Sequence, residues 1–318
     1  MSTLLLDKQA VNSLLNMEEV LVVVEEAFRT WGEGKGNMPP KAYLTVEKGD
    51  FRAMPAALTG HAGMKWVNAH PNNKSRNLPS VMAVIIYNDP ETGYPLAIMD
   101  ATNITAYRTG AAAAIASKYL ARSDSKSLGI IGAGTQAHTQ IIAHMEVFNL
   151  NSVNTFDITP GSAEKLASDL PEFPVKLCTI EEAAASDIVC TLTPSRKPAV
   201  MNDWIKEGTH INAIGADAAG KEELDPQILR RAMVVVDDIK QSTAGGEINV
   251  PIQKGIYSTN DIHGTLADLV LGKIPGRTNS QTITVFDSTG IAIEDIAVAG
   301  LMYEKAWQSG DYPMIDLV

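Results

Sequence analysis

The sequence predicts an α/β protein in which a Rossmann-type doubly wound parallel sheet accompanies a second, α+β domain. From Ser127 onward, short apolar runs alternate with helical segments, which is the pattern of a parallel sheet covered by helices on both faces. Before that point, a helical segment is followed by strand-like runs separated by turns, which indicates a mostly antiparallel sheet. At 318 residues the chain is long enough for two domains with separate cores.

The first part of the chain is expected to begin with a helix over residues 4–31. Val20, Val24 and their apolar neighbours recur at helical spacing, and Asn12 or Asn16 can cap the segment. Glycines and prolines then divide "GEGKGNMPPKAYLTVEKGDFRAMPA" into short extended pieces typical of hairpins, and "NDPETG" is a further hairpin turn. An alanine-rich helix, "ATNITAYRTGAAAAIASKYLAR", follows.

The second part alternates strands and helices. The strands are "LGIIG", "VNTFD", "PVKLC", "DIVCTLT", "HINAIG", "MVVVDD" and "TITVFD". Helices are expected over 135–148 and 162–170, and one begins at the capping box Thr179–Glu182. The amphipathic helix in "STGIAIEDIAVAGLMYEKAW" is long enough to return to the first domain.

A glycine turn follows the first strand of this second part. The run from Gly132 to Ala137, "GAGTQA", fits G-x-G-x-x-G/A, in which Gly132 permits the turn and Gly134 lets backbone approach a pyrophosphate. Asp157 ends the next strand, 25 residues after Gly132, near the offset of a carboxylate that binds a ribose hydroxyl. No Arg or Lys stands beside Asp157 to accept a 2′-phosphate. The pattern therefore favours NAD over NADP; the alternative is an ordinary turn with a solvated aspartate.

Composition excludes several classes of protein. A net charge of −11 argues against nucleic acid and anionic membrane as partners, and no apolar run approaches the roughly 20 residues of a membrane span. The N-terminus has no signal-peptide pattern. Cys178 and Cys190 are too far apart for a redox or zinc pair, and no metal site is expected. We expect a cytoplasmic protein.

Five charged side chains stand in apolar or glycine-rich surroundings: Lys41, Arg52, Lys65, Arg108 and Asp217. A buried charge is unfavourable unless an opposite charge answers it, so several cations close together require an anion. A substrate carboxylate and a cofactor pyrophosphate are candidate anions. The alternative is that each charge is a rim residue or a structural ion pair.

Several motifs give the chain a family resemblance. "RAMPA", "GMKWVNAHP", "GYPLAIMDAT", "YRTGAAAAIASKYLAR", "GIIGAGTQA", "GADAAGKEELD" and "FDSTG" resemble the motif series of the ornithine cyclodeaminase/μ-crystallin family, with the archaeal-type alanine dehydrogenases closest. The resemblance covers about residues 3–306. It implies a substrate-binding and dimerisation domain over 1–115 plus 298–318, an inserted NAD-binding domain over 116–297, an active site between them and a homodimer.

The resemblance also implies roles for individual residues. Lys65 matches the active-site lysine and Asp217 the proton-transfer acid, and which of them is the main acid/base stays open. Lys41 takes the place of the basic residue that holds the substrate carboxylate. The positions that match cofactor contacts are Arg108, Thr135, Gln136, Asp157, Lys221 and Ser288.

Arg52 is the departure that bears on the substrate. Ornithine cyclodeaminases typically carry a glutamate here that meets the distal ammonium of ornithine, and Arg52 reverses that charge. An arginine can instead bind the carboxylate of a short amino acid bidentately. We therefore expect oxidative deamination of L-alanine to pyruvate and ammonia with NAD, and the reverse amination. An ornithine cyclodeaminase, and a μ-crystallin-like nucleotide-binding protein or ketimine reductase, are the alternatives.

Overall fold

The computed structural model describes residues 2–317 and divides into two compact units. The first contains residues 2–108 and 291–317, and the second is Thr109–Gly290. The chain thus leaves the first unit within one helix, α3 (Thr102–Leu120), and re-enters it at the start of the last helix, α11 (Ala292–Ser309). The mixed α/β composition with a parallel sheet confirms the predicted fold class.

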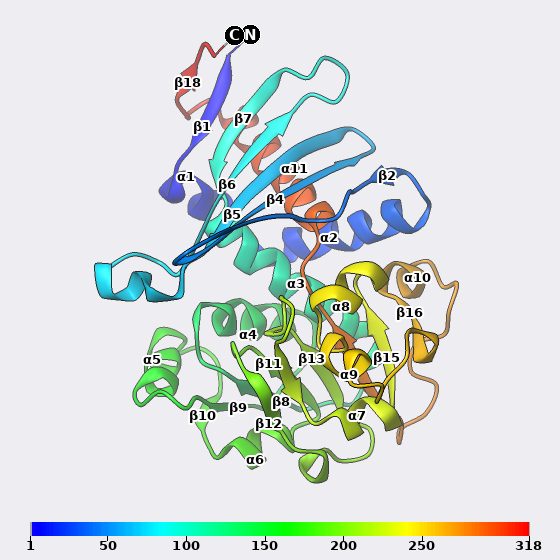
Figure 1. Cartoon of the computed structure of the whole chain (residues 1–318). Coiled ribbons are helices and arrows are strands. Elements are labelled where there is room, and N and C mark those ends of the chain that lie inside the picture. The colour runs from blue at the N-terminus through cyan, green and yellow to red at the C-terminus, as the bar shows by residue number, and fades with distance from the viewer. Residues whose placement is uncertain (1, 318) are drawn as a thin grey trace. The chain divides into compact units, whose positions relative to one another are not determined.

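The first unit is built on an eight-stranded sheet (Figure 1). Its strands run in the order β18-β1-β7-β6-β5-β4-β2, with β3 paired to β4, and all pairs except β1–β7 are antiparallel. The bounds are β1 Thr3–Leu6, β2 Gly36–Asn37, β3 Ala42–Val46, β4 Gly49–Leu58, β5 His61–Ala69, β6 Val81–Asn88, β7 Pro95–Asp100 and β18 Met314–Ile315. The helices are α1 Lys8–Leu14, α2 Met17–Gly32, the 3₁₀ turn η1 Pro71–Arg76 and α11.

The start of the chain differs from the expected single helix. Thr3–Leu6 forms strand β1, which pairs parallel with β7, and Thr3 Oγ1 donates to the Pro95 carbonyl at 2.6 Å. Pairing with a distant strand therefore overrides the helical preference of the three leucines. The expected cap at Asn16 is confirmed, because its side chain accepts a hydrogen bond from the Glu19 amide at the start of α2.

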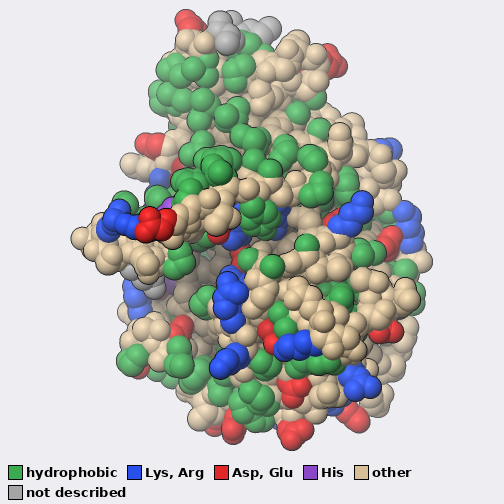
Figure 2. Space-filling view, in the orientation of Figure 1, with side chains coloured by type: hydrophobic (Ala, Val, Ile, Leu, Met, Phe, Trp, Pro, Cys, Tyr) green, Lys and Arg blue, Asp and Glu red, His purple; other side chains and the backbone are tan. Residues whose placement is uncertain are grey.

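The two faces of this sheet differ. On the inner face, α11 packs against β4 and β5, and Lys65 and Val67 are buried. Successive strand residues point to opposite faces, so the neighbours of Lys65 point outward. This outer face carries exposed hydrophobic side chains, and Figure 2 shows such side chains gathered over the first unit. They include Leu44, Trp66, Val84 and Ile86.

The second unit is a doubly wound parallel sheet in the order β10-β9-β8-β11-β13-β17-β15-β16. The strands are β8 Ser127–Ile131, β9 Ser152–Phe156, β10 Val175–Leu177, β11 Ile188–Thr191, β13 His210–Ala213, β15 Ala232–Val236, β16 Ile262–Thr265 and β17 Ile283–Asp287. The helices are α4 Thr135–Val147, α5 Ser162–Asp169, α6 Ile180–Ala184, α7 Pro226–Arg231, α8 Ile239–Gly245, α9 Asn249–Gln253 and α10 Leu266–Val270, with 3₁₀ turns η2 Asn202–Trp204 and η3 Thr259–Asp261. A small sheet pairs β12 (Arg196–Val200) with β14 (Glu222–Leu224).

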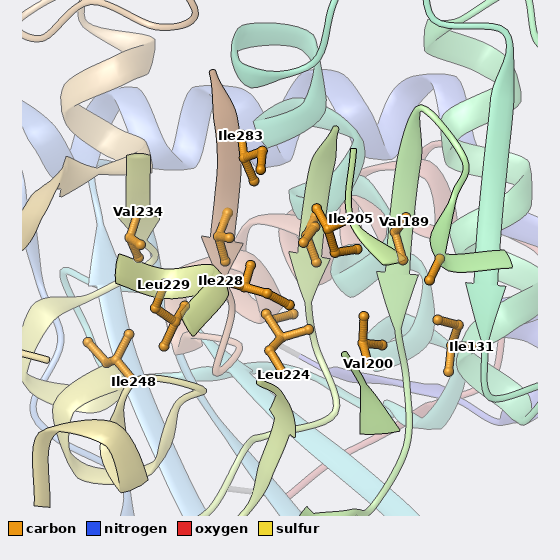
Figure 3. Packing of buried hydrophobic residues seen from close by; sticks show 14 of the residues in the cluster. Ile131, Val189, Val200, Ile205, Leu224, Ile228, Leu229, Val234, Ile248 and Ile283 are labelled. Carbon is orange, nitrogen blue, oxygen red and sulfur yellow. The ribbon is translucent and has the colours of Figure 1, made fainter. Parts of the chain in front are cut away.

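Aliphatic side chains fill the space beneath this sheet (Figure 3). Ile131 and Val189 come from adjacent central strands, and Val200, Leu224 and Ile228 come from the small sheet and the helix after it. This packing fixes the small sheet against the large one, and with it the loop that leads into β14. Within residues 2–317, no helix has the length and apolarity that a membrane span requires.

Candidate functional site

Lys65 lies at the centre of a buried charge cluster in the first unit. Its side chain is 1% exposed, and its ammonium lies 2.7 Å from both carboxylate oxygens of Asp295 in α11. Arg108 in α3 donates from Nε to the same Asp295 at 3.0 Å and from Nη1 to Glu294 at 2.8 Å. Two cations are therefore answered by two carboxylates of the chain itself, which is the structural ion pairing that the sequence analysis gave as its alternative, without naming these acids.

The surroundings of Lys65 bring its pKa to about 7. Burial is the largest cause, because it disfavours the charged form, and the positive charges of Arg108 and Lys41 act in the same direction. The Asp295 carboxylate opposes them by attraction and hydrogen bonding. At neutral pH the amine is thus divided between its two protonation states, which suits a group that both accepts and donates a proton.

Arg52 lies on the same face of the sheet as Lys65. Arg52 pairs with Val67 in the β4–β5 register, and Lys65 and Val67 point to the same side. Its Nε donates to Asp50 at 2.7 Å, and its guanidinium carbon lies 5.4 Å from the ring centroid of Tyr43. A carboxylate and an aromatic face thus orient the guanidinium from two sides.

The glycine turn of the second unit has the geometry of an anion-binding loop. Gly132 adopts φ +103°, a conformation that favours glycine, and leads from β8 to α4. Gly134 is the exposed N-cap of α4, makes no side-chain cap hydrogen bond, and a Cβ built on it would meet open space. Thr135 is exposed and Ala137 is fully buried, so the first turn of the helix faces outward while its next residue packs inside.

Asp157 stands beside this turn. Its carboxylate accepts hydrogen bonds from the backbone amides of Ala133 at 2.7 Å and Thr159 at 2.7 Å. The first of these ties the end of β9 to the glycine turn. Asp157 is half-buried, so part of its carboxylate faces outward at the carboxyl edge of the sheet, where open α/β sheets bind ligands.

Two polar atoms near this edge lack partners. Gln136 Oε1 and Ser288 Oγ are buried and have no hydrogen-bond partner among the described residues. Ser288 follows β17, and its backbone amide donates to the carbonyl of Ala213 at the end of β13. Because buried polar atoms are nearly always paired, these two are candidate contacts for a polar ligand at this edge.

Asp217 and Lys221 lie together on the loop between β13 and β14. Lys221 Nζ donates to Asp217 Oδ1 at 2.5 Å and to the Gly215 carbonyl at 3.2 Å. Asn249 supports the loop from below, since its side chain accepts from the Gly220 amide and donates to the Lys221 carbonyl, both at 3.0 Å. Asp217 is therefore paired with Lys221 within the second unit.

The glycine-rich segment Thr243–Asn249, "TAGGEIN", also supports the loop between β13 and β14. Glu247 accepts from the backbone amides of Glu223 at 3.0 Å and Leu224 at 2.7 Å. A Cβ at Gly245 would come within 3.2 Å of Ala218, and one at Gly246 would meet the Asp287 carboxylate at 2.5 Å. A Cβ is therefore excluded at Gly246 and would be tight at Gly245, so close packing explains glycine in this segment.

Comparison with known proteins identifies the family. The model of the ornithine cyclodeaminase/mu-crystallin family matches residues 1–310. The chain belongs to this family.

The chain is similar to curated relatives and to solved structures of this family. The alanine dehydrogenase of Archaeoglobus fulgidus is 51% identical over 308 residues, which is 96% of each chain. A solved structure of an archaeal alanine dehydrogenase dimer with bound NAD has a TM-score of 0.98 at 50% identity and covers both chains completely. The Δ(1)-pyrroline-2-carboxylate reductase of Thermococcus litoralis, solved with NADH and L-proline, has a TM-score of 0.95 at 41% identity, covering 98% of this chain and 99% of that one.

Within this family member, the candidate residues fall into two groups. Lys41, Arg52, Lys65 and Arg108 belong to the first unit, where the charge of Lys41 reaches Lys65 and Arg108 shares Asp295 with it. The glycine turn and its partners belong to the second unit: Gly132, Gly134, Thr135, Gln136, Asp157, Asp217, Lys221 and Ser288. The sequence predicted the members of both groups but not the carboxylates that pair with the cations.

Glu294 and Asp295 are the site residues that sequence reasoning missed. They are adjacent acids in the first turn of an otherwise apolar helix, where helix-capping explains acids without any further role. Their complete burial is the unusual feature, and it comes only from packing against the sheet. The sequence signal that could have identified these two acids is their position inside the apolar run "GIAIEDIAVAG".

Proposed function

We propose that the protein is an NAD-dependent alanine dehydrogenase, which converts L-alanine to pyruvate and ammonia and catalyses the reverse amination. The observation that carries the proposal is the 51% identity, over 96% of both chains, to the alanine dehydrogenase of Archaeoglobus fulgidus. The buried Lys65, with a pKa of about 7, supplies a proton-transfer group suited to this chemistry.

The second unit would hold NAD. The open N-terminus of α4 at Gly134 offers backbone amides to a pyrophosphate, and Asp157 offers a carboxylate to a ribose hydroxyl. The unpartnered Gln136 Oε1 and Ser288 Oγ are further polar contacts for the cofactor. Thr135, Lys221 and Arg108 complete the proposed cofactor-binding set. When bound, NAD supplies the acceptor for the hydride that leaves the substrate Cα.

The first unit would bind the amino acid. Arg52 and Lys41 are proposed to hold its carboxylate, with Arg52 oriented by Asp50 and Tyr43. A cationic rather than anionic side chain at position 52 opposes a substrate with a distal ammonium and accepts a short one. This charge favours alanine over ornithine.

Proton transfer is assigned to Lys65 and Asp217. One of them removes a proton from the substrate amine as the carbon–nitrogen bond becomes an imine. After this proton has passed to solvent, the same group accepts a proton from the water that adds to the imine carbon and returns it to the nitrogen, so that ammonia leaves and the oxo acid forms. Lys65 can exchange a proton near neutral pH because burial and neighbouring cations weaken its hold on the proton.

We further propose a cytoplasmic homodimer that associates through the outer face of the first unit. A solved relative at 50% identity is a dimer, and the exposed Leu44, Trp66, Val84 and Ile86 form a hydrophobic face on this sheet. Exposed apolar surfaces of this kind mark interfaces. Light scattering should give a dimer for the wild type and a monomer for Trp66→Asp/Val84→Asp.

One assay separates the proposed function from its alternatives. The enzyme is supplied with NAD and L-alanine, with NAD and L-ornithine, and with NADH and Δ(1)-pyrroline-2-carboxylate. NADH accumulation with alanine is the expected result. Proline formation without net NADH would identify a cyclodeaminase. NADH oxidation with the cyclic imine, without turnover of alanine, would identify a reductase like the relative with 41% identity.

A further inference from the structure

Asp295 holds Lys65 and Arg108 at once. Its Oδ1 accepts a hydrogen bond from Lys65 Nζ at 2.7 Å and another from Arg108 Nε at 3.0 Å. The carboxylate is fully buried, and the helix that carries it packs across β4 and β5. A single carboxylate thus fixes the distance between the amine and the guanidinium.

A comparison with the neighbouring Glu294 shows that the contacts of Asp295 are not ordinary helix capping. Glu294 Oε1 accepts from the Ile291 amide at 3.1 Å at the start of α11, while its Oε2 accepts from Arg108. Both hydrogen bonds to Asp295 instead come from cationic side chains. Helix formation explains Glu294 in part, but it does not explain why an aspartate in this turn reaches across to β5.

We propose that Asp295 is a positioning residue of the dehydrogenase reaction: its carboxylate holds the Lys65 amine in the orientation and protonation balance that proton transfer requires, and joins it to Arg108. This inference rests on the proposed function. The charged groups around Lys65 come from three other parts of the first unit: Asp295 and Glu294 in α11, Arg108 in α3, and Lys41 before β3. Among these, Asp295 is the anion in direct contact with the amine.

Two consequences distinguish positioning from a structural role. Without the negative charge, the ammonium form of Lys65 becomes less favourable, so its pKa falls. If the free amine accepts the substrate proton, the acidic limb of the kcat profile must then move to lower pH. Without the fixed contact, the amine also loses its orientation, so kcat falls more than the affinity for NADH changes.

The test compares Asp295→Asn with the matched variant Glu294→Gln, using alanine oxidation between pH 5 and 10. For Asp295→Asn we expect kcat to fall about 10- to 100-fold and the acidic limb to move down by about one pH unit, with the Kd for NADH changing by a smaller factor than kcat. Glu294→Gln removes a charge one residue away and should leave the position of the limb unchanged, because Glu294 contacts Arg108 and not Lys65.

Asp295→Glu provides a second test that preserves the charge and guards against loss of folding. The added methylene moves the carboxylate, so kcat should fall at least about tenfold while the acidic limb stays in place. Wild-type kcat in Asp295→Glu, or an unmoved limb in Asp295→Asn, overturns the inference while the proposed function stands. A wild-type enzyme that is inert with alanine overturns the proposed function first, and this inference with it.

Discussion

The two units bury acidic side chains in different ways. In the first, two cations, Lys65 and Arg108, face the carboxylates of Glu294 and Asp295. In the second, four buried acids accept hydrogen bonds from backbone amides, most of which belong to other residues. These acids are Glu223, Asp237, Glu247 and Asp287. Opposed charges adjust the proton affinity of a side chain, whereas amide-bound carboxylates fix the path of the backbone. The first arrangement suits chemistry and the second suits the shaping of a binding loop.

The Glu223 carboxylate illustrates the second arrangement. Oε1 accepts from the Thr193 amide at 2.6 Å and the Thr193 hydroxyl at 2.8 Å, and Oε2 accepts from the Thr191 hydroxyl and the Gly215 amide, both at 2.8 Å. Burial raises the pKa of this carboxyl and these hydrogen bonds lower it. The side chain thereby ties together the loops that follow two adjacent parallel strands, β11 and β13.

The largest expected effect comes from replacing Lys65, at the centre of the charge cluster in the first unit. Lys65→Ala removes the proposed proton-transfer group and should lower kcat for alanine oxidation by about 10²- to 10⁴-fold. The Kd for NADH should stay within about twofold, because Lys65 is assigned to proton transfer and is not among the proposed cofactor contacts. Steady-state kinetics and NADH fluorescence titration measure the two quantities. Lys8→Ala, at an exposed lysine of α1, is the control, and a kcat for Lys65→Ala within tenfold of wild type would falsify the role of Lys65.

An intermediate effect is expected when one of the amide-bound carboxylates of the second unit is replaced. In Glu223→Gln, the new amide group must point a donor at either the Thr193 or the Gly215 backbone amide, which leaves a buried donor unpaired. We expect the Kd for NADH to rise about tenfold, equivalent to about 1.4 kcal/mol, because the loops at the cofactor edge lose their fixed positions. Calorimetric titration measures this change.

Glu222→Gln is the matched control for that experiment. Glu222 is adjacent and equally buried, but its carboxylate pairs with the side chain of Lys254 at 3.0 Å. The control should leave the Kd for NADH near the wild-type value. If both variants bind NADH equally well, the carboxylate of Glu223 does not shape the cofactor loop.

Local signals predicted most of the fold. The glycine turn, the capping box at Thr179 and the hairpin at "NDPETG" all occur where the sequence places them, because each depends on residues close together in the chain. Strand β1 was missed since its pairing with β7 joins residues more than 90 apart. The family and fold-class predictions are confirmed, whereas the roles of the individual site residues stay predictions.

The charge partners were predicted least well. The sequence analysis took a substrate carboxylate and a cofactor pyrophosphate as the anions that would answer Lys65 and the cations near it. In the structure, Arg108 is the cation with the largest effect on the pKa of Lys65, and Asp295 is the anion that opposes this effect. Asp295 is 230 residues from Lys65, and no local pattern relates an acid in the last helix to a lysine in β5.

The second unit also contains a third kind of buried network, which is polar but uncharged. His144 Nε2 lies 2.9 Å from Ser117 Oγ, and Asn212 donates to the same hydroxyl at 2.9 Å. The Asn212 carbonyl oxygen lies 3.2 Å from His210 Nε2, and His210 Nδ1 lies 2.9 Å from Thr284 Oγ1. Burial lowers the pKa of His144 to about 4 and that of His210 to about 3, so both rings are neutral at pH 7.

The smallest expected effect is the pH dependence of stability that this network creates. A histidine with a lowered pKa in the folded state contributes its full stability above its unfolded pKa of 6.5, and this contribution is lost as the pH falls toward the folded value. Each histidine therefore lowers the free energy of unfolding by up to about 1.4 kcal/mol per pH unit between pH 6.5 and 4. Urea unfolding of His144→Gln should show a shallower loss over this range than the wild type. His138→Gln, on a half-exposed histidine of the same helix that contacts Asp169, is the control for a substitution outside the buried network. Equal slopes in all three proteins would mean that His144 is already charged in the folded state, which the buried, hydrogen-bonded network of the second unit could not accommodate without rearranging.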